Sequence, residues 1–228
     1  MYRPLTKSAN SSIGDPAWQR PWDARLARYL VAPLKDSRVS PNHLTTVRLV
    51  IGLAAAGAFV AGTYGWSNLG ALALAVSNFL DHTDGELARI SGKSSRFGHC
   101  YDLASDATVT ILLFVAIGIG VDASGDDAWL GAPIVQGAVA GVAIALIFYL
   151  RMRLLEIGGN SAARQPSVGG FEVEDVLYLL PLVTLFDGLS SLLMAASIGS
   201  PLFAVWQVFE YRRVMRRIRL GSPAVRAG

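Results

Sequence analysis

The sequence predicts an all-α integral membrane protein, in which an N-terminal interfacial amphipathic helix precedes a bundle of six transmembrane helices. Of its 228 residues, 52% are hydrophobic and only 16% are charged, and the mean hydropathy is +0.42. Such a chain is too apolar for an ordinary soluble domain. Two further observations support the prediction: apolar runs of about 20 residues, the length that crosses a bilayer, and an uneven distribution of basic residues.

The segment before the first span has the pattern of an interfacial helix, which we expect within residues 21–43. Four apolar residues fall on one helical face and two arginines on the other: Trp22, Leu26, Tyr29 and Leu30, against Arg25 and Arg28. This is typical of a helix that lies in the headgroup region with aromatic anchors. A soluble helix packed on cytoplasmic loops is the alternative. Residues 1–20 are predicted to be flexible.

Six apolar segments account for the expected spans. They cover residues 44–63, 69–89, 102–121, 129–150, 174–186 and 191–211. The fifth is the shortest and contains Pro181, which is tolerated where neighbouring helices satisfy the carbonyl that a proline frees. We therefore expect one six-helix domain over residues 44–215, followed by a basic tail over 216–228.

The basic residues predict the orientation of these spans. The connectors near Gly65, at 122–127 and at 187–188 contain no Lys or Arg, whereas all 20 basic residues lie on the other side or in helices near it. By the positive-inside rule both termini and the connector around 90–101 face the cytoplasm, most simply at the cell inner membrane. The same residues explain the net charge of +3, so we expect no nucleic-acid partner.

Four aspartates lie in or beside the second and third predicted spans. Asp81 and Asp84 are three residues apart and Asp102 and Asp106 are four apart, so each pair shares a helical face. Each carboxylate costs about 2.5–3.5 kcal/mol at the centre of a bilayer, and four cost on the order of 10 kcal/mol. Arg89 is the only basic residue that the sequence places close to them, so metal ions are expected to supply the remaining positive charge.

The spacing also predicts which metals bind. The segment between the two pairs is long enough to reverse the chain, and four converging carboxylates make an all-oxygen site suited to Mg²⁺ or Mn²⁺. Two such ions about 3.5–4 Å apart can clamp a phosphoryl group during in-line displacement. Gly85 and Ala88 would let a ligand approach the helix backbone, Arg89 fits phosphate, and Gly98 would let a loop pass close to the metals.

These residues resemble the signature of the CDP-alcohol phosphotransferase family, also called CDP-alcohol phosphatidyltransferases. The pattern D-x2-D-G-x2-A-R-x8-G-x3-D-x3-D runs from Asp81 to Asp106 without a gap or mismatch. The sequence PNHLTTVR, residues 41–48, also resembles the segment that opens the family's first membrane helix. The resemblance covers about residues 20–215 and implies a six-helix bundle that forms a homodimer.

The resemblance implies a role for each matching position. Asp81, Asp84 and Asp102 would bind one metal ion, and Asp81, Asp102 and Asp106 the second. Asp106 would also be the general base that takes the proton of the acceptor hydroxyl. Around the metals, four residues would form the CDP-binding part of the site: Gly85, Ala88, Arg89 and Gly98. The implied reaction is attack by an alcohol on the β-phosphorus of a CDP-alcohol, with release of CMP.

The motif is compatible with two arrangements of donor and acceptor. CDP-diacylglycerol with a small polar alcohol acceptor is the commonest arrangement, and a CDP-linked head group with a lipid acceptor is the alternative. A phosphorylated acceptor would suit Arg151, Arg153 and Arg164, although these residues could equally orient the helix ends. Three acids that would suit a polyol or an amine better, or could cap a helix, are Glu172, Glu174 and Asp175.

The sequence contains two smaller features, a histidine inside the motif and a GxxxG pair, and two other functions are alternatives to phosphotransfer. His82 lies inside the motif at a position that the family does not fix. Gly137 and Gly141 form a GxxxG pair that could lie at a dimer interface. A membrane prenyltransferase would carry its aspartates on more distant helices. A divalent-cation transporter would not explain the glycines, alanine and arginine that accompany the acids.

Overall fold

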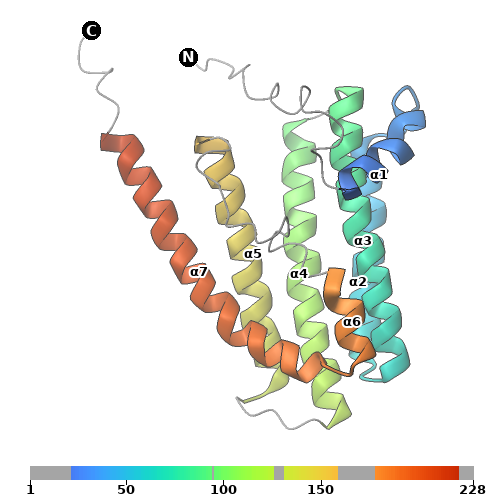
Figure 1. The fold of residues 1–228 in the computed structure, drawn as a ribbon, viewed down its shortest axis with the longest axis vertical. Helices are drawn as coiled ribbons and strands as arrows, with labels where there is room; N and C mark the ends of the chain where they lie inside the picture. Colours follow the sequence, from blue (N-terminus) through green and yellow to red (C-terminus); the bar gives the residue numbers. More distant parts are fainter. Residues whose placement is uncertain (1–21, 94, 126–130, 159–177, 221–228) are drawn as a thin grey trace.

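A computed structural model of the chain describes residues 22–93, 95–125, 131–158 and 178–220, and within these ranges all regular structure is helical. Five long helices stand side by side along most of the height of the molecule (Figure 1). They are α2 (Pro41–Val60), α3 (Tyr64–Ser91), α4 (Arg96–Ser124), α5 (Pro133–Gly158) and α7 (Leu189–Leu220). The short elements are α1 (Trp22–Val31), a 3₁₀ turn (Ala32–Leu34) and α6 (Leu180–Leu185).

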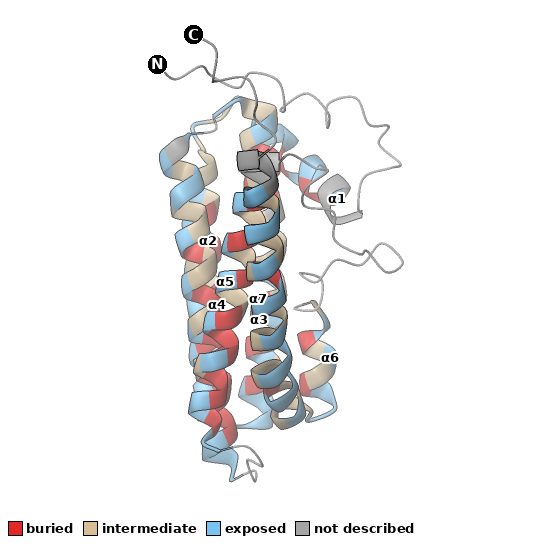
Figure 2. Ribbon diagram, turned by 90° about the vertical axis from the view of Figure 1, so that its left-hand side faces the viewer, coloured by how far each residue is buried: buried red, intermediate tan, exposed pale blue. Residues whose placement is uncertain are grey.

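The helix α4 lies at the centre of the bundle, where it packs on α2, α5 and α7 (Figure 1). Each of α3 and α4 packs on α2, α5 packs on α4, and α7 packs on α5, while α1 and α6 both lie against α3. The largest completely buried apolar side chains come from four of the long helices: Phe59, Leu74, Leu113, Ile117 and Leu193. Buried residues follow the facing sides of the helices (Figure 2). Large apolar side chains such as Val50, Leu72 and Leu202 are exposed on the outside, as expected of a surface that meets lipid.

Within the part of the chain that the structure describes, four helical segments are long and apolar enough to cross a membrane. They are Pro41–Val60, Phe97–Ser124, Pro133–Leu154 and Leu189–Arg216. Their length and composition are those of an integral membrane protein. The predicted six spans are not confirmed. The second corresponds to α3, which has 28 residues but carries the charged residues of the motif in its last part. The fifth corresponds partly to α6, whose 6 residues are too short to cross on their own.

The helix predicted before the first span is present as α1. Ala27 and Val31 of α1 are buried, whereas Leu26, Tyr29 and Leu30 on the predicted apolar face are exposed. Whether that face lies in a membrane interface stays a prediction. The predicted flexible residues 1–20 lie outside the described residues, as does the tail beyond Leu220.

Glycines let α5 approach α4 closely. A Cβ atom at Gly137 would overlap the carbonyl oxygen of Phe114, and one at Gly141 would lie 2.9 Å from the Cα of Ile111. The GxxxG face is therefore covered by α4 of the same chain. The suggestion that this face forms a dimer interface is wrong, because the space in front of both glycines is already occupied.

One end of the bundle, which we call the basic end, carries the connector between α3 and α4, the C-terminal ends of α5 and α7, and α1 (Figure 1). Its described helices and connector bring together many basic residues: Arg28, Arg89, Lys93, Arg151, Arg153, Arg212, Arg213 and Arg216. At the other end, the connectors that follow α2, α4 and α6 contain no Lys or Arg. The chain is thus polarised along the bundle axis as the sequence predicts.

Candidate active site

The site is built where α3 ends and α4 begins, at the basic end. Gly92 closes α3 in a left-handed conformation (φ 66°), which glycine adopts without strain. Ser95 then caps α4 by accepting a hydrogen bond from the backbone N–H of Gly98 at 2.9 Å. This tight reversal makes the two helices antiparallel and brings the aspartates of α3 opposite those of α4.

Three of the four aspartates converge. Asp81 on α3 and Asp102 and Asp106 on α4 each place one carboxylate oxygen so that the three lie within 4.8 Å of one another. All three side chains are partly exposed. A divalent cation can bind three oxygens at such separations, so the convergence predicted from the spacing is confirmed for these three residues.

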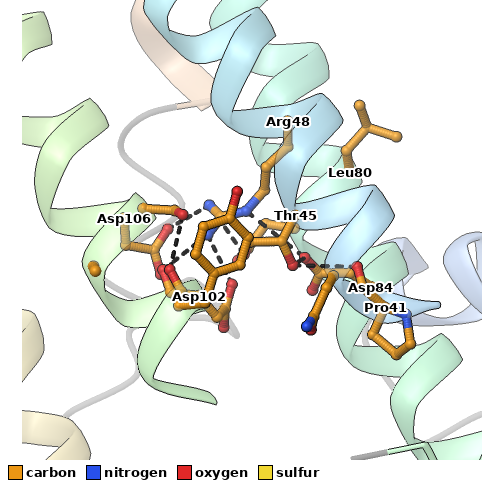
Figure 3. Close-up of polar contacts among 12 residues, drawn as sticks. Pro41, Thr45, Arg48, Leu80, Asp84, Asp102 and Asp106 are labelled. Carbon is orange, nitrogen blue, oxygen red and sulfur yellow. Dashed lines mark hydrogen bonds and ion pairs between the residues drawn. The ribbon is translucent and has the colours of Figure 1, made fainter. Parts of the chain in front are cut away.

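Asp84 has a different environment. Its side chain is buried, and its Oδ2 accepts a hydrogen bond of 2.7 Å from Oγ1 of Thr45 on α2. Thr45 and Asp84 lie to one side of Asp102 and Asp106 in the close-up (Figure 3). A buried carboxylate needs such a partner, because leaving it unsatisfied in a protein interior is costly. The predicted role of Asp84 as a metal ligand stays a prediction.

Arg48 is the cation that the sequence reasoning missed. Its guanidinium reaches all four carboxylates: Nη1 lies 3.1 Å from Asp81 and also contacts Asp106, Nη2 lies 2.8 Å from Asp102, and Nε lies 3.8 Å from Asp84. The side chain is buried and points from α2 into the cluster (Figure 3). The expectation that Arg89 is the only basic residue close to the aspartates is therefore wrong. The available signal was the three-residue spacing of Thr45 and Arg48, which places both on one face of α2.

Arg89 takes a different direction. Its Nη1 donates a hydrogen bond of 2.6 Å to Oε1 of Glu86, and 62% of its side chain is exposed. Gly85 lies beside it, since a Cβ at that position would be 3.6 Å from Arg89 Nη2 and would meet nothing closer. Ala88 lies on the same helix and is half-buried. Contact of these residues with CDP stays a prediction, and the side chain of His82 lies outside the described residues.

Gly98 belongs to a helix and not to a loop. It lies in the first turn of α4, which begins at Arg96, because the connector between α3 and α4 is shorter than predicted. A Cβ at this position would be 2.7 Å from Oδ1 of Asn42 on α2. Within the described residues, the requirement for a small residue here thus comes from the close approach of α2 and α4.

A cavity of about 290 Å³ adjoins the carboxylates. Arg48, Asp81 and Asp106 line one part of it, and Phe148 and Arg151 of α5 together with Tyr178 line another. Of the two described arginines predicted to suit a phosphorylated acceptor, Arg151 lines the cavity, whereas Arg153 is exposed and is not among the lining residues. Arg164 and the acids at positions 172, 174 and 175 lie outside the described residues.

The donor set fits divalent cations. Among the described residues, four carboxylates surround one guanidinium, and hard oxygen ligands are those that Mg²⁺ and Mn²⁺ prefer. Asp81, Asp102 and Asp106 would hold such an ion. Bound metal would supply electrostatic stabilisation of a diphosphate and of the charge that develops on its leaving group.

Comparison with known proteins agrees with this chemistry. The chain is 28% identical over 122 residues to the bifunctional IPC transferase and DIPP synthase of Aquifex aeolicus, covering 54% of the chain and 27% of that protein. It is 38% identical over 82 residues to the archaetidylinositol phosphate synthase of Pyrococcus horikoshii, covering 35% of the chain and 42% of that protein. The chain therefore matches less than half the length of either relative. The CDP-alcohol phosphatidyltransferase family matches residues 38–206, and the chain belongs to this family.

Proposed function

We propose that this protein transfers a substituted phosphoryl group, a phosphatidyl group, from CDP-diacylglycerol to the hydroxyl of a small polar alcohol during phospholipid biosynthesis. The observation that carries the proposal is the convergence of Asp81, Asp102 and Asp106 beside a cavity, within a domain of a family whose name describes this transfer. Mg²⁺ or Mn²⁺, two ions per site, is the proposed cofactor. The proposed binding residues for CDP are Gly85, Ala88, Arg89 and Gly98.

In the proposed reaction the acceptor oxygen forms a bond to the β-phosphorus of the CDP-alcohol. The bond between that phosphorus and the oxygen bridging to the α-phosphate breaks, and CMP leaves with the bridging oxygen. The acceptor proton passes to a carboxylate oxygen of Asp106, which lines the cavity and can meet a hydroxyl there. Asp81 and Asp102 would hold the divalent cations, which would supply positive charge opposite the diphosphate.

The acceptor that we propose is a phosphorylated polyol. Arg151 lines the cavity that also contains Asp106, so an acceptor could reach the base with its hydroxyl and the guanidinium with its phosphate. The relative from Pyrococcus horikoshii is named as an archaetidylinositol phosphate synthase, and an inositol phosphate is the acceptor of this class that should be tried first.

The membrane arrangement follows from the polarity of the bundle. We propose that α3 and the region ending in α6 complete a six-span domain, that the basic end and both termini face the cytoplasm, and that the protein forms a homodimer in the cell inner membrane. The supporting observation is that the carboxylates lie in the halves of α3 and α4 that are nearer to the basic end. Water-soluble nucleotide and acceptor would reach the site from that side.

The deciding experiment measures CMP release by the purified protein with CDP-diacylglycerol and Mn²⁺. Inositol phosphate, inositol, glycerol 3-phosphate, serine and ethanolamine are supplied one at a time. Release that depends on inositol phosphate supports both the donor and the acceptor class. Release with another acceptor replaces the acceptor proposal. If none supports release, CDP-choline and CDP-ethanolamine with diacylglycerol test the reverse arrangement of donor and acceptor, and activity there would overturn the proposed donor.

A further inference from the structure

Arg48 occupies the centre of the carboxylate cluster. It is only 4% exposed, and its three guanidinium nitrogens are distributed over Asp81, Asp84, Asp102 and Asp106. Nη2 also donates a hydrogen bond to the backbone carbonyl of Asp102 at 3.2 Å. The cation thus touches the three residues whose oxygens converge and also the fourth, which lies apart.

The backbone of Arg48 is held as firmly as its side chain. Its carbonyl oxygen accepts a hydrogen bond of 2.8 Å from Oγ of Ser77, a buried residue on α3. Through this bond and the carboxylate contacts, Arg48 connects α2 to both α3 and α4. The guanidinium is therefore directed into the cluster by the fold and does not reach it as a flexible surface side chain would.

The positive charge of Arg48 reduces the electrostatic repulsion among the carboxylates. Without it, the carboxylates of Asp81, Asp102 and Asp106 would face one another within 4.8 Å with Asp84 nearby, and like charges at that distance in a partly buried site repel strongly. Among the described residues, four carboxylates lie within reach of this one guanidinium, so with all of them ionised the acids outnumber it by three. A divalent ion bound to Asp81, Asp102 and Asp106 would lie close to the carboxylate oxygens that Nη1 and Nη2 contact, and its positive charge would oppose that of the guanidinium. The arginine and the metal therefore compete for the same carboxylates.

We propose that Arg48 is an internal counter-ion: it holds the four carboxylates together while no metal is bound, and it lowers the affinity of the site for divalent cations. The proposal rests on the metal site proposed above. Arg48 is in this view a positioning residue, and its effect is on metal affinity and on the stability of the metal-free protein. Its charge leaves the site able to release metal, which a cluster of four unopposed carboxylates would hold more tightly.

The test compares Arg48→Gln and Arg48→Lys with the unchanged protein, using the full chain purified in detergent. Arg213→Gln is the matched control, because Arg213 is exposed near the end of α7 and its loss changes the net charge equally. Mn²⁺ affinity is measured from the electron paramagnetic resonance signal of free Mn²⁺. Thermal unfolding is followed in chelator and again in saturating Mn²⁺.

We expect Arg48→Gln to bind Mn²⁺ at least about tenfold more tightly, because an opposing unit charge is removed within a few ångströms of the ion. Arg48→Lys, which keeps the charge but loses the fork, should fall between Gln and the unchanged protein. In chelator, the Tm of Arg48→Gln should fall by about 5 °C or more, and saturating Mn²⁺ should remove most of this loss. The control should resemble the unchanged protein in both measurements.

Three results would overturn the inference. Unchanged or weaker Mn²⁺ binding in both variants would show that Arg48 does not compete with metal. A loss of Tm that is equally large with and without Mn²⁺ would show an ordinary structural role. Absence of Mn²⁺ binding in the unchanged protein would overturn the metal site itself, and so separates failure of the proposed function from failure of this inference. Should Arg48→Gln fail to fold, Arg48→Lys decides by the same criteria.

Discussion

Thr45 on α2 donates a hydrogen bond from Oγ1 to Oδ2 of Asp84 on α3 at 2.7 Å, and both side chains are buried. This contact fixes the one carboxylate of the motif that does not converge with the other three. It also ties α2, which carries Arg48, to the helix that carries the first half of the motif. The site is therefore formed by three helices, although the motif itself spans only two.

Thr45→Val should destabilise the protein and reduce its activity. The substitution keeps the shape of the side chain but leaves a buried carboxylate without its donor, at a cost of about 1–3 kcal/mol in the free energy of unfolding. Thermal unfolding and CMP release measure the two effects. Thr46→Val is the control, because Thr46 is exposed and bonds to the carbonyl of Asn42 and to Tyr101. Equal effects of the two variants on stability and activity would show that the hydrogen bond to Asp84 contributes no more than the exposed one made by Thr46.

Asp106→Asn should abolish turnover while much of the binding of metal and CDP is retained. An amide cannot take the acceptor proton, and loss of a general base typically costs at least about 100-fold in rate. The measurement is CMP release, with binding followed separately by titration with Mn²⁺ and CMP. Asp122→Asn, an exposed residue near the far end of α4, serves as the control. Near-normal CMP release from the Asp106 variant would remove this residue from the role of base.

Removal of divalent cations should abolish activity, and Mg²⁺ or Mn²⁺ should restore it. The reason is the negative charge of the cluster, which by itself would repel a diphosphate. The measurement is CMP release in chelator followed by addition of each metal. Activity that persists after thorough removal of metal would contradict the proposed role of Asp81, Asp102 and Asp106.

Arg151→Gln should raise the KM for a phosphorylated acceptor by about tenfold or more, since a charge-assisted hydrogen bond to phosphate is lost. The KM for the CDP-alcohol should change little. The control is Arg153→Gln on the same helix, because Arg153 is exposed and does not line the cavity. An unchanged KM for the acceptor in Arg151→Gln would show that the phosphate does not bind at this residue.

Gly137→Ala should destabilise the monomer fold itself. The added Cβ would overlap the carbonyl oxygen of Phe114 and push α5 away from α4, and overpacking of this kind costs about 1–3 kcal/mol. Thermal unfolding measures the loss. Gly57→Ala is the control, because a Cβ there would meet nothing within 4 Å. A Gly137 variant that unfolds normally but loses its oligomeric state would instead place this face between two copies of the chain.

The local chemistry of the site could be read from residue spacing. Separations of three and four residues put Asp81 with Asp84 and Asp102 with Asp106 on common helical faces, since the period of a helix is known in advance. The lengths of the apolar segments likewise predicted long helices over most of the described chain. The start of α4 and the place of Gly98 were missed because helix boundaries depend on caps such as Ser95, which are short and easily confused with loop residues.

The helical class, the polarity of the bundle, the family and the two carboxylate pairs could be predicted from the amino-acid sequence, because each of these depends on composition or on spacing along one segment. The identity of the cation that faces the carboxylates could be seen only once the helices were packed together. Arg89 is near them in the sequence but turns to Glu86, whereas Arg48 contacts Asp102 and Asp106 across 54 and 58 positions of chain. Arg48 contacts these two aspartates because α4 packs on α2. That packing depends on side chains along the whole contact between the two helices.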